Sequence, residues 1–378
     1  MVGMLRWLLL TGCLLLMQGC QSLGVGSVMR DRADYGGAIT DSWKEQTLLN
    51  IIKLRYFDTP AFLDISSVIS SYQLQGEINF AREIFPRSPQ DSNRAFGLSG
   101  SYMDRPTISY APLSGEKFVN SLLRPIPPQA IFAMILSGHQ ADFILRATVR
   151  AINDVYNHSA APSRARTEDP AFARVVSALR RIQQAGALGM RVEQPQGSGQ
   201  TVRIEIQQSG GRTERQGRGE TTWVFFRDRE GEDVAEDIQF VRKALGVASE
   251  ARELRLTFGS LRSDGGEIAL FTRSIMEILV ELAAGVEVPA PHLAEGRARD
   301  MPALVMESDP RLYPVARIRA SNERPQDAFS AVQYRGYWFW IDDRDLASKR
   351  VFTFLRIFSA IAETGVTPQL PVLTIPAN

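Results

Sequence analysis

Two short runs of alternating apolar and polar residues constrain this chain more than any other feature. In residues 72–80, YQLQGEINF, every second position is apolar or glycine, and residues 96–102, FGLSGSY, repeat the pattern. Period-two alternation is typical of a β-strand with one apolar and one polar face. Each run approaches the ~9–11 residues of a strand that crosses a membrane. The positions predicted to share the apolar face are Tyr72, Leu74, Ile78, Phe80, Phe96, Leu98 and Tyr102.

The sequence leaves two interpretations of this hairpin open. A half-buried antiparallel hairpin that packs on helices shows the same alternation. A hairpin that enters lipid needs partners, because its unpaired backbone edges cannot be left in hydrocarbon. A ring of copies would satisfy those edges, as in the curli secretion channel lipoproteins, which this chain resembles in logic and not in motif.

The N-terminus has the layout of a secretory signal peptide over residues 1–19, with one basic residue, an apolar run and a small residue. The apolar run is shorter than the ~20 residues of a membrane-spanning helix. The tetrapeptide MQGC, which ends at Cys20, resembles the lipobox of bacterial lipoproteins. A rival match that ends at Cys13 would leave too short an apolar run. The resemblance implies cleavage before Cys20 and lipidation of that residue, and Gln21 after it favours the outer membrane.

Cysteine usage and charge exclude two further classes of protein. Both cysteines lie in the signal segment and residues 21–378 contain none, so the exported domain cannot rely on disulfides. A chain of this length can bury a core large enough to fold without them. Lysine and arginine number 43 against 42 acidic residues. A nucleic-acid-binding protein would need a basic excess, so we expect no nucleic-acid partner.

The pattern of elements predicts an α+β fold. We expect mainly antiparallel sheets built from β-hairpins, with helices packed on one face. Residues 20–36 are rich in glycine and serine and are interpreted as a flexible tether. The capping box formed by Ser42 and Glu45 predicts the start of the first helix.

The chain length predicts about two domains. The polar, proline-containing segment 158–170 is the best candidate for their boundary, which gives domains at residues 37–160 and 165–378. Within the second, the turn Asp264-Gly265-Gly266 predicts a hairpin between its flanking strands.

Two sets of residues are candidates for chemistry. Ser114 and Lys117 have the spacing of the nucleophile and lysine in penicillin-binding proteins and class A β-lactamases, but the other two motifs of that family are absent. Ser114 is therefore interpreted as a helix N-cap. Asp342 and Asp343 follow an aromatic strand and suit either an acid pair or a metal site, or ordinary carboxylates at a helix start. The three histidines fit no zinc motif, so no metal or other cofactor is expected.

These features favour a non-enzymatic lipoprotein, anchored by Cys20 in the outer membrane and facing the periplasm. Its role would be structural or docking, with an envelope protein or another copy of itself as partner. One alternative is a subunit of an oligomeric outer-membrane pore that inserts residues 70–103. The other is a periplasmic hydrolase acting on cell wall or glycan.

Overall fold

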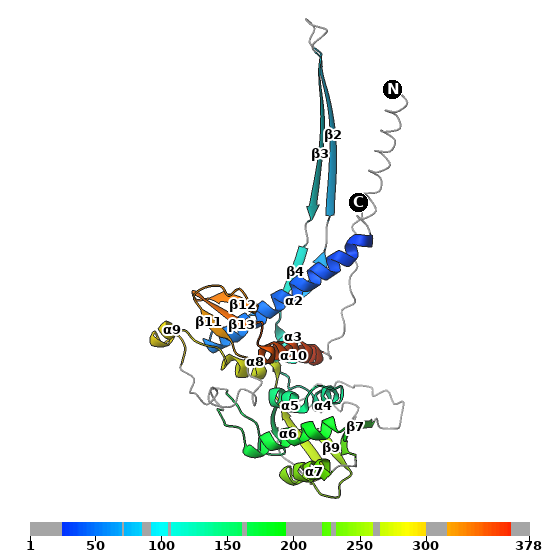
Figure 1. Cartoon of the computed structure of the whole chain (residues 1–378), viewed down its shortest axis with the longest axis vertical. Helices are drawn as coiled ribbons and strands as arrows, with labels where there is room; N and C mark the ends of the chain where they lie inside the picture. The colour runs from blue at the N-terminus through cyan, green and yellow to red at the C-terminus, as the bar shows by residue number, and fades with distance from the viewer. Residues whose placement is uncertain are drawn as a thin grey trace, which may run out of the picture. The chain divides into compact units, whose positions relative to one another are not determined.

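The fold is known from a computed structural model, in which the chain has the expected mixture of helices and mainly antiparallel sheets (Figure 1). The chain divides into two compact units. We call residues 61–115 the ribbon and the remainder the body. The structure describes residues 25–69, 72–84, 92–104, 107–160, 165–193, 221–227, 232–259, 265–299 and 316–363.

The larger sheet of the body has six strands in the order β6-β5-β10-β9-β8-β7. Burial alternates along its central strands, so that Val224 and Leu256 are buried while Trp223 and Arg255 are at least partly exposed. Helices α4, α5 and α6 contact strands of this sheet, and α7 packs on α6. The strands are β5 (Val149–Ile152), β6 (Val155–Tyr156), β7 (Leu188–Glu193), β8 (Thr221–Phe226), β9 (Glu253–Phe258) and β10 (Glu267–Thr272). The helices are α4 (Pro128–Leu136), α5 (Ala141–Thr148), α6 (Pro170–Gln184) and α7 (Glu232–Ala244).

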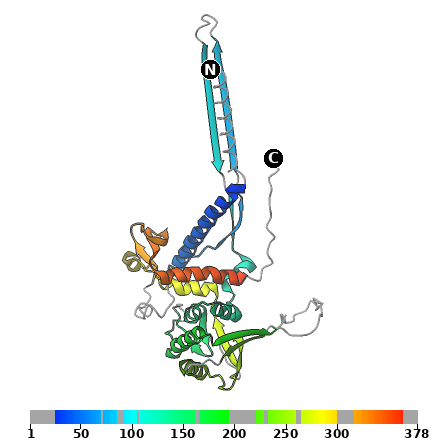
Figure 2. The ribbon, with the colours of Figure 1, turned by 45° about the vertical axis from the view of Figure 1, so that its right-hand side comes forward.

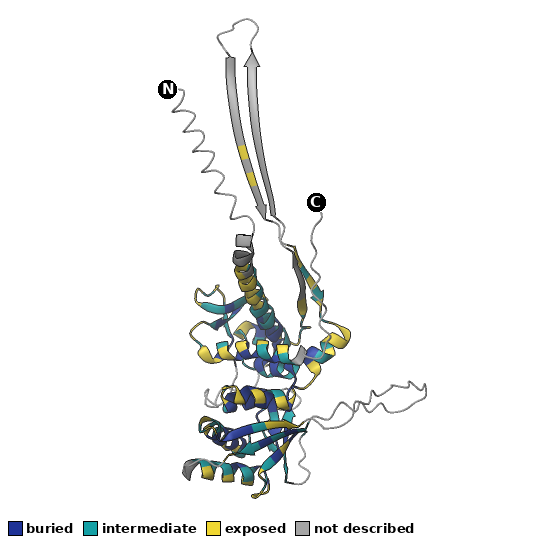
Figure 3. Ribbon diagram, turned by 90° about the vertical axis from the view of Figure 1, so that its right-hand side faces the viewer, coloured by how far each residue is buried: buried dark blue, intermediate teal, exposed yellow. Residues whose placement is uncertain are grey.

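The other part of the body joins the remaining helices to a small antiparallel sheet of order β11-β13-β12. In helix α2, residues 33–47 are exposed or half-buried, and Leu48, Ile51 and Ile52 near its end are buried (Figure 3). Helices α8 and α10 lie side by side (Figure 2). The elements are α2 (Val25–Arg55), α3 (Gly115–Phe118), the π-helix η2 (Val119–Leu123), α8 (Ile275–Ala283), α9 (Ala290–Ala294), β11 (Arg319–Ser321), β12 (Ala328–Tyr334), β13 (Tyr337–Asp342) and α10 (Leu346–Glu363).

The hairpin expected at Asp264-Gly265-Gly266 is wrong. Strands β9 and β10 pair in parallel, with Leu256 opposite Ile268. Asp264 lies outside the described residues, and Gly265 contacts the residues that follow α7, because its carbonyl accepts the Ala248 N–H at 2.9 Å. Gly265 has a φ of +73°, a conformation that glycine adopts easily. The glycine that suggested a tight hairpin turn is therefore used in a connection between two parallel strands.

The expected boundary at residues 158–170 is not confirmed. Strands β5 and β6 precede this segment and β7 to β10 follow it, yet all six share one sheet. The segment is tied to the rest of the body by an ion pair of Glu168 with Arg146 and by the Glu281 side chain, which accepts the Ser159 hydroxyl and the Ala160 N–H. Its polar residues satisfy buried groups, which composition alone cannot distinguish from a solvated linker.

Helix α2 begins at Val25, so residues 25–36 are helical and not the expected flexible tether. Ser42 and Glu45 lie inside the helix and do not start it. Glycine costs a helix only ~1 kcal/mol relative to alanine, so Gly36 and Gly37 weaken this stretch without ending it. Among the described residues, no helix is both long and apolar enough to cross a membrane.

Candidate functional site

The ribbon contains a long antiparallel pair, β2 (Tyr72–Ile84) and β3 (Ser92–Asp104). Thirteen residues of each strand pair in unbroken register, from Tyr72 opposite Asp104 to Ile84 opposite Ser92. At about 3.4 Å per residue, a strand of this length extends about 44 Å. The expected hairpin is therefore present and extends beyond both alternating runs.

The register brings the predicted apolar positions together. Directly opposite residues of an antiparallel pair share a face, and the register pairs apolar positions with one another. Polar positions pair on the other face, where Ser99 and Ser101 are exposed. The apolar-face pairs are Leu74 with Tyr102, Gly76 with Gly100, Ile78 with Leu98 and Phe80 with Phe96, and the polar-face pairs include Gln75 with Ser101 and Glu77 with Ser99.

A second strand pair, β1 (Leu63–Ile69) with β4 (Thr107–Pro112), forms the rest of the ribbon. Near Ile69, which pairs with Thr107, the two strands keep the register of β2–β3, where Tyr72 pairs with Asp104. A register shift between Ile65 and Ser67 places Ile65 and Val68 on one face although they are three residues apart. Tyr110, opposite Ile65, has 51% of its surface exposed, so this face presents an apolar side chain to solvent.

The ribbon contains no helix or second layer of sheet among its described elements. An isolated two-stranded hairpin is marginally stable at best in water, because it buries too little apolar surface. A long hairpin with one apolar face therefore needs an occupant for that face. This makes β2–β3 the strongest candidate site in the chain.

The other sequence candidates show no catalytic arrangement. Ser114 and Lys117 are both exposed, at the junction between the ribbon and α3. Asp342 accepts the Arg344 N–H at 2.9 Å, and Asp343 pairs with Lys349 at 2.6 Å. Both residues lie just before α10, and the residue that caps this helix is Asp345, which accepts the Ser348 N–H at 3.1 Å. No group of three metal-binding side chains occurs among the described residues.

Sequence reasoning missed a buried charged cluster beneath the 158–170 segment. Arg273, which is 5% exposed, donates to the carbonyl oxygens of Arg146 and His158. Glu281 lies 3.9 Å from Arg273 and accepts the Ser159 hydroxyl and the Ala160 N–H, each at 2.7 Å. Burial lowers the pKa of Arg273, although Glu281 opposes the shift. The cluster joins α8 to the end of α5 and to residues 158–160.

A second, partly buried cluster fixes the end of α2. The Tyr56 hydroxyl lies 2.7 Å from His292 Nδ1, and Asp58 binds Tyr334 and Arg335. Burial raises the pKa of Tyr56 to about 12. The hydrogen bond from Tyr334 lowers the pKa of Asp58. These contacts join α2 to α9 and to the β12–β13 turn.

Two buried histidines give the fold a predicted dependence on pH. Burial lowers the pKa of both His158 and His292. The unfolded chain therefore binds more protons than the folded one as pH falls below the ordinary histidine pKa of ~6.5. We expect the free energy of unfolding to decrease from about pH 7.5 to about pH 5.5.

Urea denaturation across this range measures the effect. A variant that carries both His158→Gln and His292→Gln should show a smaller change in the free energy of unfolding with pH. This holds whatever the double substitution does to stability at any single pH. The Glu168 carboxyl, whose pKa is raised by burial, acts in the opposite direction, so the comparison with wild type isolates the histidines. An unchanged slope would contradict the assignment.

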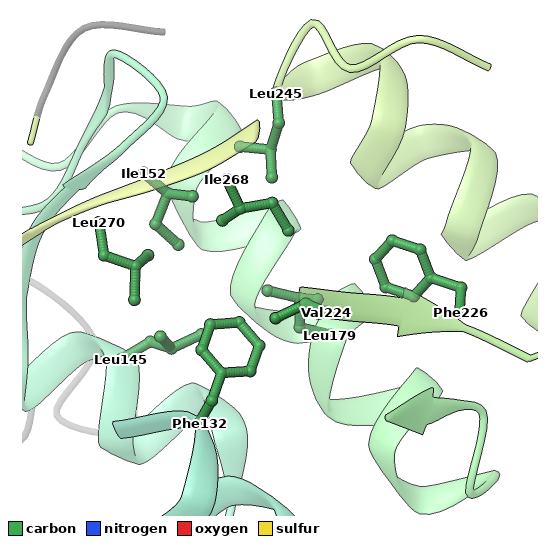
Figure 4. Close-up of a pocket in the computed structure, with 9 residues that line it drawn as sticks. All are labelled: Phe132, Leu145, Ile152, Leu179, Val224, Phe226, Leu245, Ile268 and Leu270. Atoms are coloured by element: carbon green, nitrogen blue, oxygen red, sulfur yellow. The ribbon is translucent and has the colours of Figure 1, made fainter. Parts of the chain in front are cut away.

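The enclosed cavity of the six-stranded sheet belongs to the core (Figure 4). Phe132, Leu145 and Leu179 from the helices meet Val224 and Ile268 from the strands around it. Its volume is about 10 Å³ and its lining is apolar. A cavity that holds one water needs ~10–15 Å³ and polar partners, so this space takes no ligand.

No protein-family model, curated protein or solved structure matches the chain. The function therefore has to be argued from the site itself.

Proposed function

We propose that this chain is a lipid-anchored subunit of an oligomeric outer-membrane pore, into which each copy inserts the hairpin β2–β3. The observation that carries the proposal is the register, which gives the hairpin one apolar and one polar face from Tyr72 to Phe80 in β2 and from Phe96 to Tyr102 in β3. Membrane-spanning strands alternate in this way, with apolar positions toward lipid and polar ones toward water.

The size of the apolar band supports the proposal. Along β2 the band runs from Tyr72 to Phe80, about 27 Å at 3.4 Å per residue, and a strand tilted by ~40° covers about 21 Å of membrane height over that length. The apolar band of outer-membrane strands is about 25 Å tall and is bounded by aromatic residues at both interfaces. Tyr72 and Tyr102 lie toward one end of this band, and Phe80 and Phe96 lie at the other.

A ring of copies is required by the hydrogen bonding of the backbone. One hairpin leaves the outer edges of β2 and β3 without strand partners among the described residues. Unpaired backbone groups are costly in hydrocarbon, and only a closed arrangement satisfies them all. Pairing β2 of one copy with β3 of the next would close the edges. The polar positions would then line the lumen.

The proposed anchor is Cys20, whose lipidation is implied by the lipobox. Helix α2 begins at Val25, five residues after it, so little chain would separate the lipid from the folded protein. Wild type should incorporate an alkyne-tagged fatty acid and fractionate with the outer membrane. Cys20→Ala should remain unlabelled and uncleaved, while Cys13→Ala, the matched control, should behave as wild type. If Cys13→Ala loses the label and Cys20→Ala keeps it, the lipidated residue is Cys13 and not Cys20.

Pore formation is tested with the purified full chain and lipid vesicles that contain a trapped dye. We expect wild type to release the dye. A variant with residues 70–105 replaced by a short glycine-serine linker should release none while the body keeps its far-UV circular dichroism. Vesicles that stay intact with assembled wild type would contradict the proposal.

A docking role is the second candidate, favoured by a groove of about 660 Å³ between α2 and β12. Residues 328–331 of β12, an outer strand of its sheet, line one wall of the groove. Asp41 and Lys44 line the other wall. An open strand edge can accept an extended segment of a partner. With docking as the sole function, the vesicles would stay intact and Cys20→Ala would be a soluble monomer.

A further inference from the structure

A pair of arginines occurs at a single level of the ribbon. The register places Arg82 of β2 directly opposite Arg94 of β3. Both are two positions beyond the aromatic pair Phe80 and Phe96 toward residues 85–91, so all four share a face. The apolar band therefore ends at two basic residues.

This pairing is unfavourable unless something compensates it. Like charges directly opposite one another destabilise an antiparallel pair. Among positions 72–84 and 92–104, the only carboxylate on that face is Asp104, ten residues from Arg94 and about 34 Å away along the strand. Glu77 and Glu83 belong to the polar face. The register thus offers the pair no acidic residue at its own level.

Phosphate is the anion that best matches two arginines. The planar guanidinium group binds phosphate oxygens through two parallel hydrogen bonds, and it remains charged at every physiological pH. At an end of an apolar band of membrane thickness, the nearest phosphates belong to lipid headgroups.

We propose that Arg82 and Arg94 bind the phosphate groups of anionic lipid headgroups at the membrane surface nearest to the last pair of the register, Ile84 with Ser92. The inference rests on the proposed function, because it requires the hairpin to cross the bilayer. In a ring, each copy would contribute one pair at the same level. The pairs would fix the depth of the hairpin and favour membranes with phosphate-rich surfaces.

The test compares Arg82→Gln with Arg94→Gln in one full-length variant against wild type. The matched control, Arg255→Gln with Arg344→Gln, removes two exposed charges from the body. Each protein is titrated onto phosphatidylcholine vesicles with and without a minor fraction of lipid A. We expect the ribbon variant to lose roughly thirtyfold in apparent affinity for the lipid A vesicles. Its affinity for phosphatidylcholine alone should change little, and the control should match wild type.

Further measurements separate this inference from the proposed function and from free phosphate. The mass of each oligomer in neutral detergent should be unchanged, which shows that assembly survives. If wild type assembles and inserts but has no preference for lipid A, the assignment of Arg82 and Arg94 to lipid phosphate is wrong. The proposed pore function would be unaffected by that result. If inorganic phosphate displaces wild type from lipid A vesicles more than sulfate at equal ionic strength, the site takes free phosphate and the lipid assignment fails.

Discussion

Leu74→Asp should abolish the membrane-inserted oligomer, whereas Gln75→Asp, one residue further along β2, should leave it intact. Leu74 is on the apolar face opposite Tyr102, and Gln75 is on the polar face opposite Ser101. A carboxylate that faces lipid costs up to about 3 kcal/mol per copy, and the cost recurs in every copy of a ring. The same carboxylate toward an aqueous lumen costs little.

Outer-membrane fractionation followed by sizing in detergent measures this difference. Both variants should retain the far-UV circular dichroism of the body, since the substitutions lie outside it. Equal loss of the oligomer in both variants would show that the ribbon does not distinguish its faces. Retention in both would show that Leu74 does not meet lipid.

Arg273→Met should cause the largest loss of stability in the body. The substitution leaves the carbonyl oxygens of Arg146 and His158 without their buried donor and leaves the Glu281 carboxylate without its nearest cation. Removing one partner of a buried charge pair costs ~3–5 kcal/mol. Arg255→Met, at a half-exposed arginine 3.8 Å from Glu267, should cost less than ~1 kcal/mol.

Urea denaturation followed by far-UV circular dichroism separates the two arginines. Glu281→Gln keeps the shape of the side chain and an acceptor for Ser159, so its loss of stability should lie between those of Arg273→Met and Arg255→Met. This variant tests the cluster even if Arg273→Met does not fold. Equal midpoints for Arg273→Met and Arg255→Met would exclude a structural role for the buried cluster.

The sequence predicted the hairpin well because its signal is local. Strict alternation from Tyr72 to Phe80 and from Phe96 to Tyr102 specifies a face, and a slip of one residue would move every apolar side chain to the polar side. The mixed α+β class followed equally from local patterns. The extension of pairing to Ile84 and Ser92 was not predicted, because Arg82 and Arg94 break the alternation at its end.

Errors arose where the outcome depends on contacts distant in sequence. The parallel pairing of β9 with β10 is set by neighbours in the sheet and not by the glycines between them. Segment 158–170 forms polar contacts with two residues outside it. Glu168 pairs with Arg146 of α5, and Ala160 donates to Glu281 of α8, which lies more than a hundred residues further along the chain. One signal was available: Glu277 and Glu281 lie one turn apart on an otherwise apolar helix, which indicates buried partners.

The most direct test of the central claim is the mass of the full-length chain extracted from membranes, measured by light scattering with the detergent contribution subtracted. The account predicts one discrete species at an integer multiple of the chain mass, large enough to close a ring of hairpins. A monomer that remains folded and stays attached through Cys20 alone would contradict it, and would leave the hairpin as a docking arm for another protein.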